Sequence, residues 1–530
     1  MSSDTAVVDQ NDATEPATGK LCLVTGATGY IGGRLVPELL AAGMRVRVFA
    51  RHPERLRDTG WFDQIEIVKG DANDPDAVRE ALTGVEVAYF LLHSLSTGKG
   101  FAHAEHSMAQ LFADTAAECD VSRLVYLGGI TPPGKSSGLS EHLRSRAEVG
   151  HVLRSSGVPT AELRAAVILG SGSASFEMLR YLTERLPAMI TPKWVSNRIQ
   201  PIAIRDVLRY LVKCADLPPE VNRHFDIGGP DVLTYLDMMQ AYARISGLPR
   251  RFIVPVPVLT PSLSSHWVGV VTPVPAGIAR PLVESLRHEV VCSEHDIAEY
   301  IPDPPGGLLP FTQAITLAIQ RVRDAQVSTR WSSASVPGAP AEPLPTDPSW
   351  AGGSLYTDVR TEPVPASKAA LWRVIEGVGG KNGWYSFPFA WEVRGWMDRG
   401  VGGVGLRRGR RDPDHLMVGE AVDFWRVEEI VAQRLLRLRA EMKLPGLAWL
   451  EFTISEDVNG RTVYGQRATF FPRGLAGHLY WWAVAPFHGV VFGSMVRNIT
   501  RRAVEFDGEG QVTAQADGET SAETPVEIAS

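Results

Sequence analysis

A short apolar segment that runs directly into a glycine-rich turn constrains the fold of this chain more than any other feature. Residues 21–25 are apolar or β-branched, and the turn at residues 25–32 reads TGATGYIG. An amphipathic helical pattern begins inside the turn, and a second apolar segment, residues 45–50, follows it. Strand, glycine turn, helix and second strand together are typical of a βαβ unit with a parallel sheet. The sequence therefore predicts an α/β fold with this turn at the carboxyl end of the first strand.

The glycine spacing of this turn suits the binding of a diphosphate. Glycine carries no side chain, so backbone amides can approach a phosphate closely, and the positive end of the helix dipole attracts the anion. The order GxxGxxG differs from the GxGxxG of many dinucleotide sites, but a predicted strand precedes it and a predicted helix follows it. The alternative is a tight turn that binds no ligand. We expect cofactor contacts from Gly26, Thr28, Gly29, Tyr30, Ile31 and Gly32.

The end of the second predicted strand indicates which dinucleotide is bound. Sites that prefer NAD(H) place Asp or Glu there, about 20 residues after the glycines, to accept a hydrogen bond from the ribose 2′-hydroxyl. This chain has Ala50, Arg51 and His52 at that point, with Arg55 following. A guanidinium matches a phosphate and keeps its charge, so Arg51 favours the 2′-phosphate of NADP(H) over NAD(H). The alternative is a solvated arginine that contacts no ligand.

Short apolar segments alternate with helical ones through the first part of the chain. This alternation predicts a doubly wound parallel sheet of the Rossmann type with helices on both faces. After Pro201 the alternation loosens, and helical patterns at 205–215 and 235–246 predict a small, mostly helical cap. Strands are expected at residues 21–25, 45–50, 66–69, 87–92, 123–127, 161–163 and 224–227.

Composition divides the chain of 530 residues, which is too long for one hydrophobic core. Residues 328–353 are rich in Ser, Pro, Ala and Gly and contain almost no large apolar side chain, which predicts a linker. The α+β domain after it is expected to have a helix at 367–375, strands at 433–439, 448–455 and 461–471, and a last helix at 487–502. The predicted order is a disordered lead (1–19), the Rossmann domain with its cap (20–327), the linker (328–353), the second domain (354–506) and a disordered acidic tail (507–530).

Several of these segments together resemble the atypical, extended-like short-chain dehydrogenases. The resemblance covers most of residues 21–323. It is carried by the segments at 25–33, 70–71, 87–92, 164–170 and 201–207. It implies that Asp71 contacts the adenine and that the end of the fourth strand runs beside the cofactor. The cofactor contacts that it adds to those of the turn are Asp71, Ala72, Leu91, Leu92 and His93.

Reductases of this family use a tyrosine and, four residues later, a lysine, and this chain departs from that pattern. In the family, the phenol gives or takes the substrate proton, and the lysine lowers its pKa and holds the ribose. The corresponding helix of this chain has His142 and Arg146 instead. We expect His142 to donate the proton, because imidazole titrates near neutrality, and Arg146 to keep the ribose and electrostatic roles. The alternative is that both are ordinary polar residues on a helix.

The second domain is rich in tryptophan and contains a cluster of arginines. Its motifs GWY at 383–385, RRGRRDP at 407–413 and DFWR at 423–426 resemble an uncharacterised domain fused to such oxidoreductases in bacteria. In outline that domain is similar to helix-grip, START-like carriers of lipids or other ligands. The tryptophans serve either a core or a ligand cavity. The arginines form either a solvated face or a site for a phosphate, a carboxylate or an anionic lipid surface.

Composition argues against several other functions. The formal net charge of -7 provides no basic field for nucleic acid. The four cysteines lie far apart and the histidines match no ligand spacing, so we expect no disulfide, no metal site and a cytoplasmic location. The apolar segment 475–496 contains His478, Pro486 and His488, which are costly at the centre of a bilayer. We therefore expect a buried amphipathic segment and no transmembrane span, and a peripheral membrane contact stays open.

These observations lead to two hypotheses of function. The first is an NADP(H)-dependent oxidoreductase, or an epimerase-like enzyme, that acts on a small, largely apolar carbonyl compound. The second is a non-catalytic NADP(H)-binding sensor or scaffold whose second domain binds a hydrophobic ligand. It is suggested because the tyrosine, the lysine and the serine that the family has after its fifth strand are all replaced in this chain. Turnover of NADPH with any substrate would favour the first, and bound cofactor without turnover the second.

Overall fold

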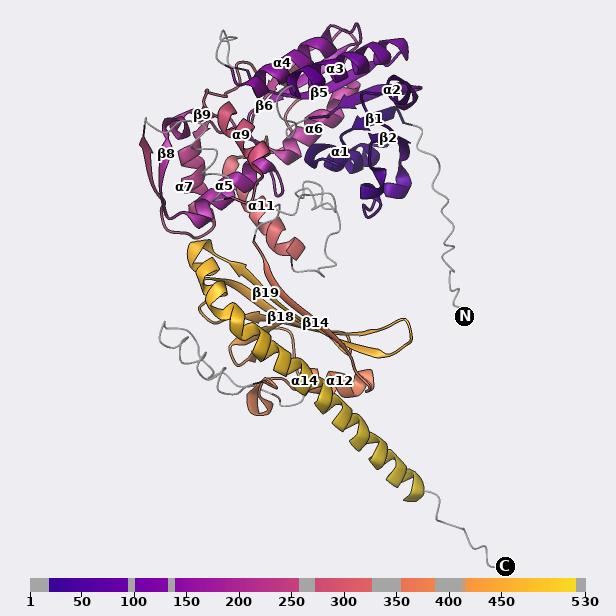
Figure 1. Cartoon of the computed structure of the whole chain (residues 1–530), viewed down its shortest axis with the longest axis vertical. Helices are drawn as coiled ribbons and strands as arrows, with labels where there is room; N and C mark the ends of the chain where they lie inside the picture. The colour runs from indigo at the N-terminus through magenta and orange to yellow at the C-terminus, as the bar shows by residue number, and fades with distance from the viewer. Residues whose placement is uncertain are drawn as a thin grey trace, which may run out of the picture. The chain divides into compact units, whose positions relative to one another are not determined.

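The computed structural model divides the chain into two compact units, Met1–Gly353 and Ser354–Ser530. It describes residues 19–93, 101–131, 139–256, 272–326, 354–386, 412 and 415–520, and Figure 1 colours the chain from indigo at the N-terminus to yellow at the C-terminus. The linker expected at 328–353 and nearly all of the expected lead lie outside the described residues.

The first unit is built on a seven-stranded sheet in which every pair of neighbouring strands is parallel. The strand order is β11-β6-β5-β4-β1-β2-β3, so the chain starts inside the sheet, winds to one edge and then returns to the other. This topology confirms the predicted doubly wound sheet. The strands are β1 (Leu21–Thr25), β2 (Arg45–Ala50), β3 (Glu66–Lys69), β4 (Val87–Phe90), β5 (Arg123–Gly129), β6 (Thr160–Ala165) and β11 (Arg223–Ile227).

Helices cover both faces of this sheet because its strands alternate between two apolar cores. Cys22 and Val24 of β1 lie in the core shared with α1 (Tyr30–Ala41) and α6 (Ile204–Lys213). Leu21 lies in the opposite core, which is shared with the helices α2 (Pro75–Leu82), α3 (Phe101–Glu118) and α4 (Glu141–Arg154). Burial on both faces is expected of a parallel sheet. Because the helices cover the faces, the carboxyl ends of the strands are left as one exposed edge.

The clearest difference from the predicted strands lies at the end of β4. Strands β1, β2 and β3 coincide with the prediction, whereas β4 ends at Phe90 and not at Leu92. The Leu91 amide donates a hydrogen bond to Thr25 Oγ1 (2.9 Å), and the strand ladder stops there. The chain after β4 is thereby fixed against the turn that follows β1.

A mostly helical cap packs around an apolar core of its own, as predicted. Short strand pairs, which the sequence did not indicate, join its helices. These pairs are β7 (Ile168–Leu169) with β10 (Ile202–Ala203), β8 (Ala188–Pro192) with β13 (Phe252–Val256), and β9 (Arg198–Ile199) with β12 (Leu233–Thr234). The helices are α5 (Ala174–Arg185), α7 (Tyr235–Ile245), α9 (Ala276–Ser285), α10 (Ile297–Tyr300) and α11 (Phe311–Gln326).

The second unit is a six-stranded antiparallel sheet with two helices packed on it. This arrangement confirms the predicted antiparallel sheet with a helix, while the likeness to helix-grip carriers stays a prediction. The strand order is β14-β19-β18-β17-β16-β15. The elements are β14 (Tyr356–Pro363), α12 (Lys368–Glu376), β15 (Ala421–Val422), β16 (Trp425–Val431), β17 (Leu435–Ala440), β18 (Gly446–Glu456), β19 (Thr462–Pro472) and α14 (Gly474–Thr520).

Helix α14 differs from the expectation at both ends and on its outer side. It spans 47 residues and continues to Thr520, so the first part of the tail expected to be disordered after Phe506 is helical. Extending a helix that is already nucleated costs little, and packing of its middle part on the sheet supplies the nucleus. The segment 475–496, expected to be buried, has an exposed side, and only 28% of the most apolar window of this helix is buried. By length and composition alone, Gly474–Gly508 is the candidate for a membrane span among the described residues.

Candidate functional site

The glycine turn after β1 has a geometry that requires glycine at two positions. Gly26 has φ +71°, and a Cβ there would lie 2.7 Å from the carbonyl oxygen of Leu91. A Cβ at Gly32 would lie 2.4 Å from the Gly26 oxygen, whereas one at Gly29 would lie 3.2 Å from the same atom. The turn therefore packs against itself and against the end of β4 through main-chain atoms.

The start of α1 fits the diphosphate of a dinucleotide. Gly29 is its N-cap residue, no side chain caps it, and its first turn contains no acidic residue. The first amides of a helix have no partner within the helix, and the positive end of the helix dipole lies there. An uncapped glycine turn at the carboxyl edge of a parallel sheet is thus an anion site without a competing carboxylate. The predicted contacts that meet in this turn are Gly26, Thr28, Gly29, Tyr30, Ile31 and Gly32.

Thr25 joins the glycine turn to the end of β4. Its hydroxyl donates to the carbonyl oxygen of Tyr89 and accepts from the Leu91 amide, both at 2.9 Å. Its side chain is fully buried. The sequence motif included Thr25 as the last residue of a strand, but gave no sign of this bridge. Leu91, Leu92 and His93 consequently follow β4 beside the turn, and their contact with the cofactor stays a prediction.

Arg51 and Asp71 lie at the same edge of the sheet, after β2 and β3. Arg51 is 73% exposed, and its Nη1 lies 4.0 Å from Asp71 Oδ2. The Asn73 amide donates to Asp71 Oδ1 (2.9 Å), and this bond, helped by the Asn73 side chain and the charge of Arg51, lowers the pKa of Asp71. Ala72 is buried beside them. At this edge, the exposed guanidinium of Arg51 can bind a phosphate, and the ionised carboxylate of Asp71 can accept hydrogen bonds.

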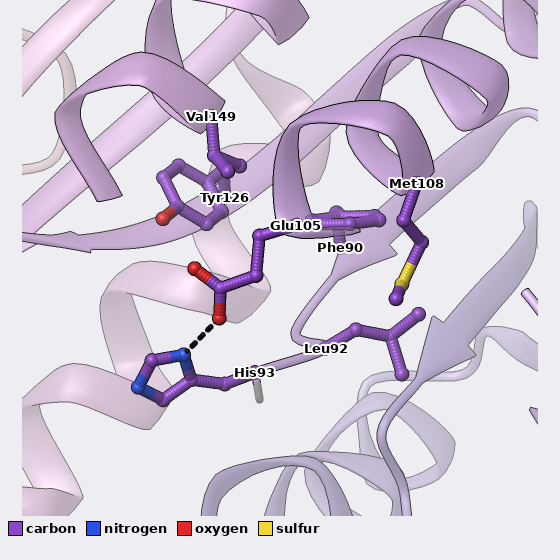
Figure 2. A pocket seen from close by; sticks show the side chains of 7 residues that line it. All are labelled: Phe90, Leu92, His93, Glu105, Met108, Tyr126 and Val149. Atoms are coloured by element: carbon purple, nitrogen blue, oxygen red, sulfur yellow. Dashed lines mark hydrogen bonds and ion pairs between the residues drawn. The ribbon is translucent and has the colours of Figure 1, made fainter. Parts of the chain in front are cut away.

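A buried acid organises the space beyond the end of β4. Glu105, on α3, has a side chain only 7% exposed, and its Oε1 accepts from His93 Nδ1 at 2.9 Å. Its Oε2 accepts from the hydroxyl of Ser145, on α4, at 2.5 Å. Figure 2 shows the Glu105 carboxylate directed at the His93 ring across a pocket. The side chains that line this pocket are Phe90, Leu92, His93, Glu105, Met108, Tyr126 and Val149.

His93 and His142 lie next to each other, but they have different surroundings. Their ring centroids are 4.8 Å apart. Burial, followed by the charge of Arg146 and the neighbouring His93, lowers the pKa of His142 to about 3. Burial also lowers the pKa of His93, although the hydrogen bond with Glu105 opposes the shift. The Nε2 atom of His93 is buried and has no hydrogen-bond partner among the described residues.

The Arg146 guanidinium contacts a main-chain oxygen and an aromatic ring. It donates to the carbonyl oxygen of Leu127 and lies 5.9 Å from the ring centroid of Tyr126. The Tyr126 hydroxyl donates in turn to the Arg146 carbonyl oxygen (3.2 Å), and burial raises the pKa of Tyr126 to about 12. The structure therefore holds His142 and Arg146 on one helix, but it removes the near-neutral titration on which the role of His142 was predicted.

Sequence reasoning missed Glu105 and Ser145, although a signal for Glu105 exists. Glu105 lies at helical spacing from Ala109, Phe112 and Ala116, all of which are buried. An acid on the apolar side of a helix is costly unless it is paired, and it therefore marks a polar cluster. Ser145 has no such signal, because serine is common on helices.

Other polar side chains of the chain lie outside this cluster. Asp206 is fully buried and accepts from the Leu309 amide (2.8 Å), and Ser173 caps α5, so both have structural roles. Trp384 donates to Asp423 (2.8 Å) within the core of the second unit. The arginines at 407–411 lie outside the described residues, and the described part of the chain has no metal-binding group of three or more His, Cys, Asp or Glu.

Comparisons with known proteins agree with the cofactor turn. Residues 26–172 match the NAD(P)H-binding family, and residues 350–495 match a family described as a protein of unknown function, DUF2867. The first unit of the chain is thus an NAD(P)H-binding domain, and a DUF2867 domain follows it.

Two curated relatives each align with about half of the chain. The (4-alkanoyl-5-oxo-2,5-dihydrofuran-3-yl)methyl phosphate reductase of Streptomyces griseus is 27% identical over 243 residues, 44% of this chain and 76% of the relative. The ceramide reductase of Caulobacter vibrioides is 26% identical over 303 residues, 55% of this chain and 92% of the relative. Among solved structures, a Citrobacter sp. triphenylmethane reductase complexed with NADP(H) aligns with a TM-score of 0.45 and 19% identity, over 56% of this chain and 99% of that one.

Proposed function

Because the chain carries an NAD(P)H-binding domain followed by a DUF2867 domain, we propose that it is an NADP(H)-dependent reductase of small, largely apolar carbonyl compounds. The observation that carries this proposal is the shared edge of the sheet: the glycine turn, Arg51 and the His93 cluster all follow the carboxyl ends of strands that pair with one another. Ligands of open α/β sheets bind at that edge. The names of the two curated relatives, both reductases, support the reaction class.

The cofactor would be held by main chain at one end and by side chains at the other. The amides of the glycine turn would hold the diphosphate, and Arg51 the 2′-phosphate that distinguishes NADP(H) from NAD(H). When bound, NADPH supplies the hydride. Leu91 and Leu92 would lie along it, since the Thr25 bridge fixes this segment to the turn.

We assign the proton to His93 and not to His142. Glu105 accepts from Nδ1 of His93, which fixes the ring and leaves Nε2 as the atom that exchanges a proton with the substrate oxygen. In carbonyl reduction, the protonated ring donates from Nε2, and in the reverse reaction the neutral ring accepts there. His142, whose pKa burial lowers to about 3, stays neutral at the pH of cells and therefore has no proton to donate.

The apolar side chains around this histidine support the substrate class. Phe90, Leu92, Met108 and Val149 line the pocket next to His93 and Glu105. Apolar walls beside a few polar groups favour an apolar ligand whose one functional atom the polar groups orient. The pocket itself has room for about one water molecule, so a carbonyl compound would place only its reacting group there and extend beyond it.

A non-catalytic NADP(H)-binding module is the second candidate, and one observation favours it. The tyrosine and lysine of the resembled family are replaced by His142 and Arg146, and both are engaged in packing or structural hydrogen bonds. In that case the cofactor would bind at the same turn without turnover.

The test is NADPH consumption by the purified full chain with a panel of apolar ketones, aldehydes and quinones. We expect turnover by the wild type and by His142→Phe, and loss of at least about 100-fold in kcat for His93→Gln, the range in which general acid catalysis contributes. Nucleotide binding, measured by calorimetry, should be unchanged in both variants. Tight NADPH binding without turnover on any substrate would establish the non-catalytic module, and undiminished turnover by His93→Gln would remove His93 from the mechanism.

A further inference from the structure

The first half of α14 presents a continuous apolar side to solvent. Trp482 and Phe487 are 70% and 67% exposed, the largest values on this helix among its large apolar side chains. Steps of three or four residues join Leu475 to Leu479 and Trp482, and Phe487 to Val490. The five-residue step between Trp482 and Phe487 widens the exposed side. The residues of this α14 apolar face are Leu475, Leu479, Trp482, Phe487 and Val490.

The opposite side of the same turns is fixed to the sheet of the second unit. The Trp481 ring stacks on Tyr356 of β14, with centroids 4.8 Å apart and an interplanar angle of 9°. His478 Nδ1 lies 2.9 Å from the Tyr356 hydroxyl, and His488 packs edge-on against Trp481 at 4.6 Å. About two turns further on, Met495 is fully buried in the core. The helix therefore cannot rotate to cover its apolar face without breaking these contacts.

Basic residues border the α14 apolar face along the sequence. The carboxylates near them are Glu505, 3.9 Å from Arg501, and Asp358 of β14, whose charge acts on His488. The sequence contains no acidic residue between Asp457 and Glu505. Arg473 lies exposed directly before the helix, and Arg497 and Arg501 lie exposed beyond the apolar face. Apolar and aromatic side chains bordered by arginines are complementary to the acyl chains and headgroups of an anionic lipid layer.

We propose that the α14 apolar face binds the surface of an anionic lipid bilayer, with the helix lying in the plane of the interface. A helix that spans the bilayer would have to carry His478 and His488 into hydrocarbon and give up the contacts with Tyr356. A second copy of the chain docked through the same face would offer Arg473 and Arg497 no carboxylate, since the face itself, residues 475–490, contains no acidic residue. Lipid is the occupant that satisfies both the apolar face and its charged borders.

The test is co-sedimentation of the full chain with vesicles of phosphatidylcholine and phosphatidylglycerol in equal amounts, compared with phosphatidylcholine alone. We expect binding to the anionic vesicles, weaker binding to the neutral ones, and release by raised salt. The double variant Leu479→Glu/Phe487→Glu should partition at least about tenfold less into anionic vesicles. Both side chains point to solvent, so its thermal unfolding should match that of the wild type.

A matched control uses an apolar side chain that is exposed elsewhere in the same unit. Val458, in the hairpin between β18 and β19, is fully exposed, and Val458→Glu should leave vesicle binding unchanged. Equal loss in Val458→Glu, or no binding of the wild type to either vesicle, would overturn the proposal. If light scattering shows that the wild type and Val458→Glu self-associate and that the double variant does not, the α14 apolar face is an interface with a second copy of the chain. Resistance of the bound wild type to alkaline carbonate extraction would indicate a span and would equally overturn surface binding.

Discussion

Replacing Gly32 by alanine isolates the contribution of the glycine turn to cofactor binding. The added Cβ would lie 2.4 Å from the Gly26 oxygen and 2.8 Å from the Gly26 carbonyl carbon. Both are main-chain atoms, so no side chain can move aside, and the turn has to open by about 1 Å to restore an ordinary contact. Lengthening an amide–phosphate hydrogen bond by that amount abolishes it, at a cost of about 1.5 to 3 kcal/mol.

This cost corresponds to a Kd for NADPH that rises by about 10-fold to 150-fold. Isothermal titration calorimetry with the purified full chain measures it directly. Gly29→Ala should have a smaller effect, because its Cβ would lie 3.2 Å from the same oxygen. Gly60→Ala is the matched control: a Cβ there meets nothing within 4 Å, and affinity should not change. If Gly32→Ala folds and binds NADPH as the wild type does, the turn does not hold the diphosphate.

The remaining predictions concern charge and protonation. Arg51→Ala should weaken NADPH binding by about 1.5 kcal/mol, the lower end of the range for a hydrogen bond to a charged group, and leave NADH binding unaffected. Arg57→Ala should change the affinity for neither cofactor. Equal losses of affinity for both cofactors in Arg51→Ala would refute the 2′-phosphate contact. Because burial holds the pKa of His93 below its usual range, the rate of carbonyl reduction should rise as pH falls through neutrality. Glu105→Gln should move that rise to still lower pH, the exposed Glu118→Gln should not, and a profile insensitive to Glu105 would contradict the relay. The folded state resists protonation of His142 down to a pKa of about 3, so the stability that this residue contributes is complete above about pH 6.5 and declines as pH falls below it. Relative to pH 7, chemical unfolding at pH 5 should show a loss of about 2 kcal/mol that His142→Phe lacks, and an identical pH dependence in the two proteins would show that His142 is not buried in this way.

Local patterns were sufficient to predict the sheet of the first unit. β1, β2 and β3 coincide with the predicted strands because each is a short apolar segment bounded by a turn. The end of β4 was missed because a side chain distant in sequence, Thr25, accepts the Leu91 amide. The short strand pairs of the cap were missed for a similar reason: two-residue strands such as β7 carry no periodicity to detect.

The part of the candidate site that depends on backbone conformation, the glycine turn, was predictable from the sequence. The part that depends on burial, the pKa of His142, was not. The glycine turn needed only the order of glycines between a strand and a helix. The role of His142 was inferred from the ordinary pKa of imidazole, but the surroundings that set its actual pKa come from Arg146, His93 and the depth of α4 in the fold. Glu105 and Ser145 enter the site from separate helices, and no spacing in the sequence links them to His93.

The Thr25 bridge has a consequence for how this chain can vary. One hydroxyl sets both where β4 stops and how near the following residues pass to the glycine turn. Only Leu91 and Leu92 separate the end of β4 from His93. A deletion or insertion there would shift the imidazole relative to Glu105 and to the glycine turn while the sheet stayed intact. The few positions after Phe90 therefore fix the site by their number as well as by their side chains.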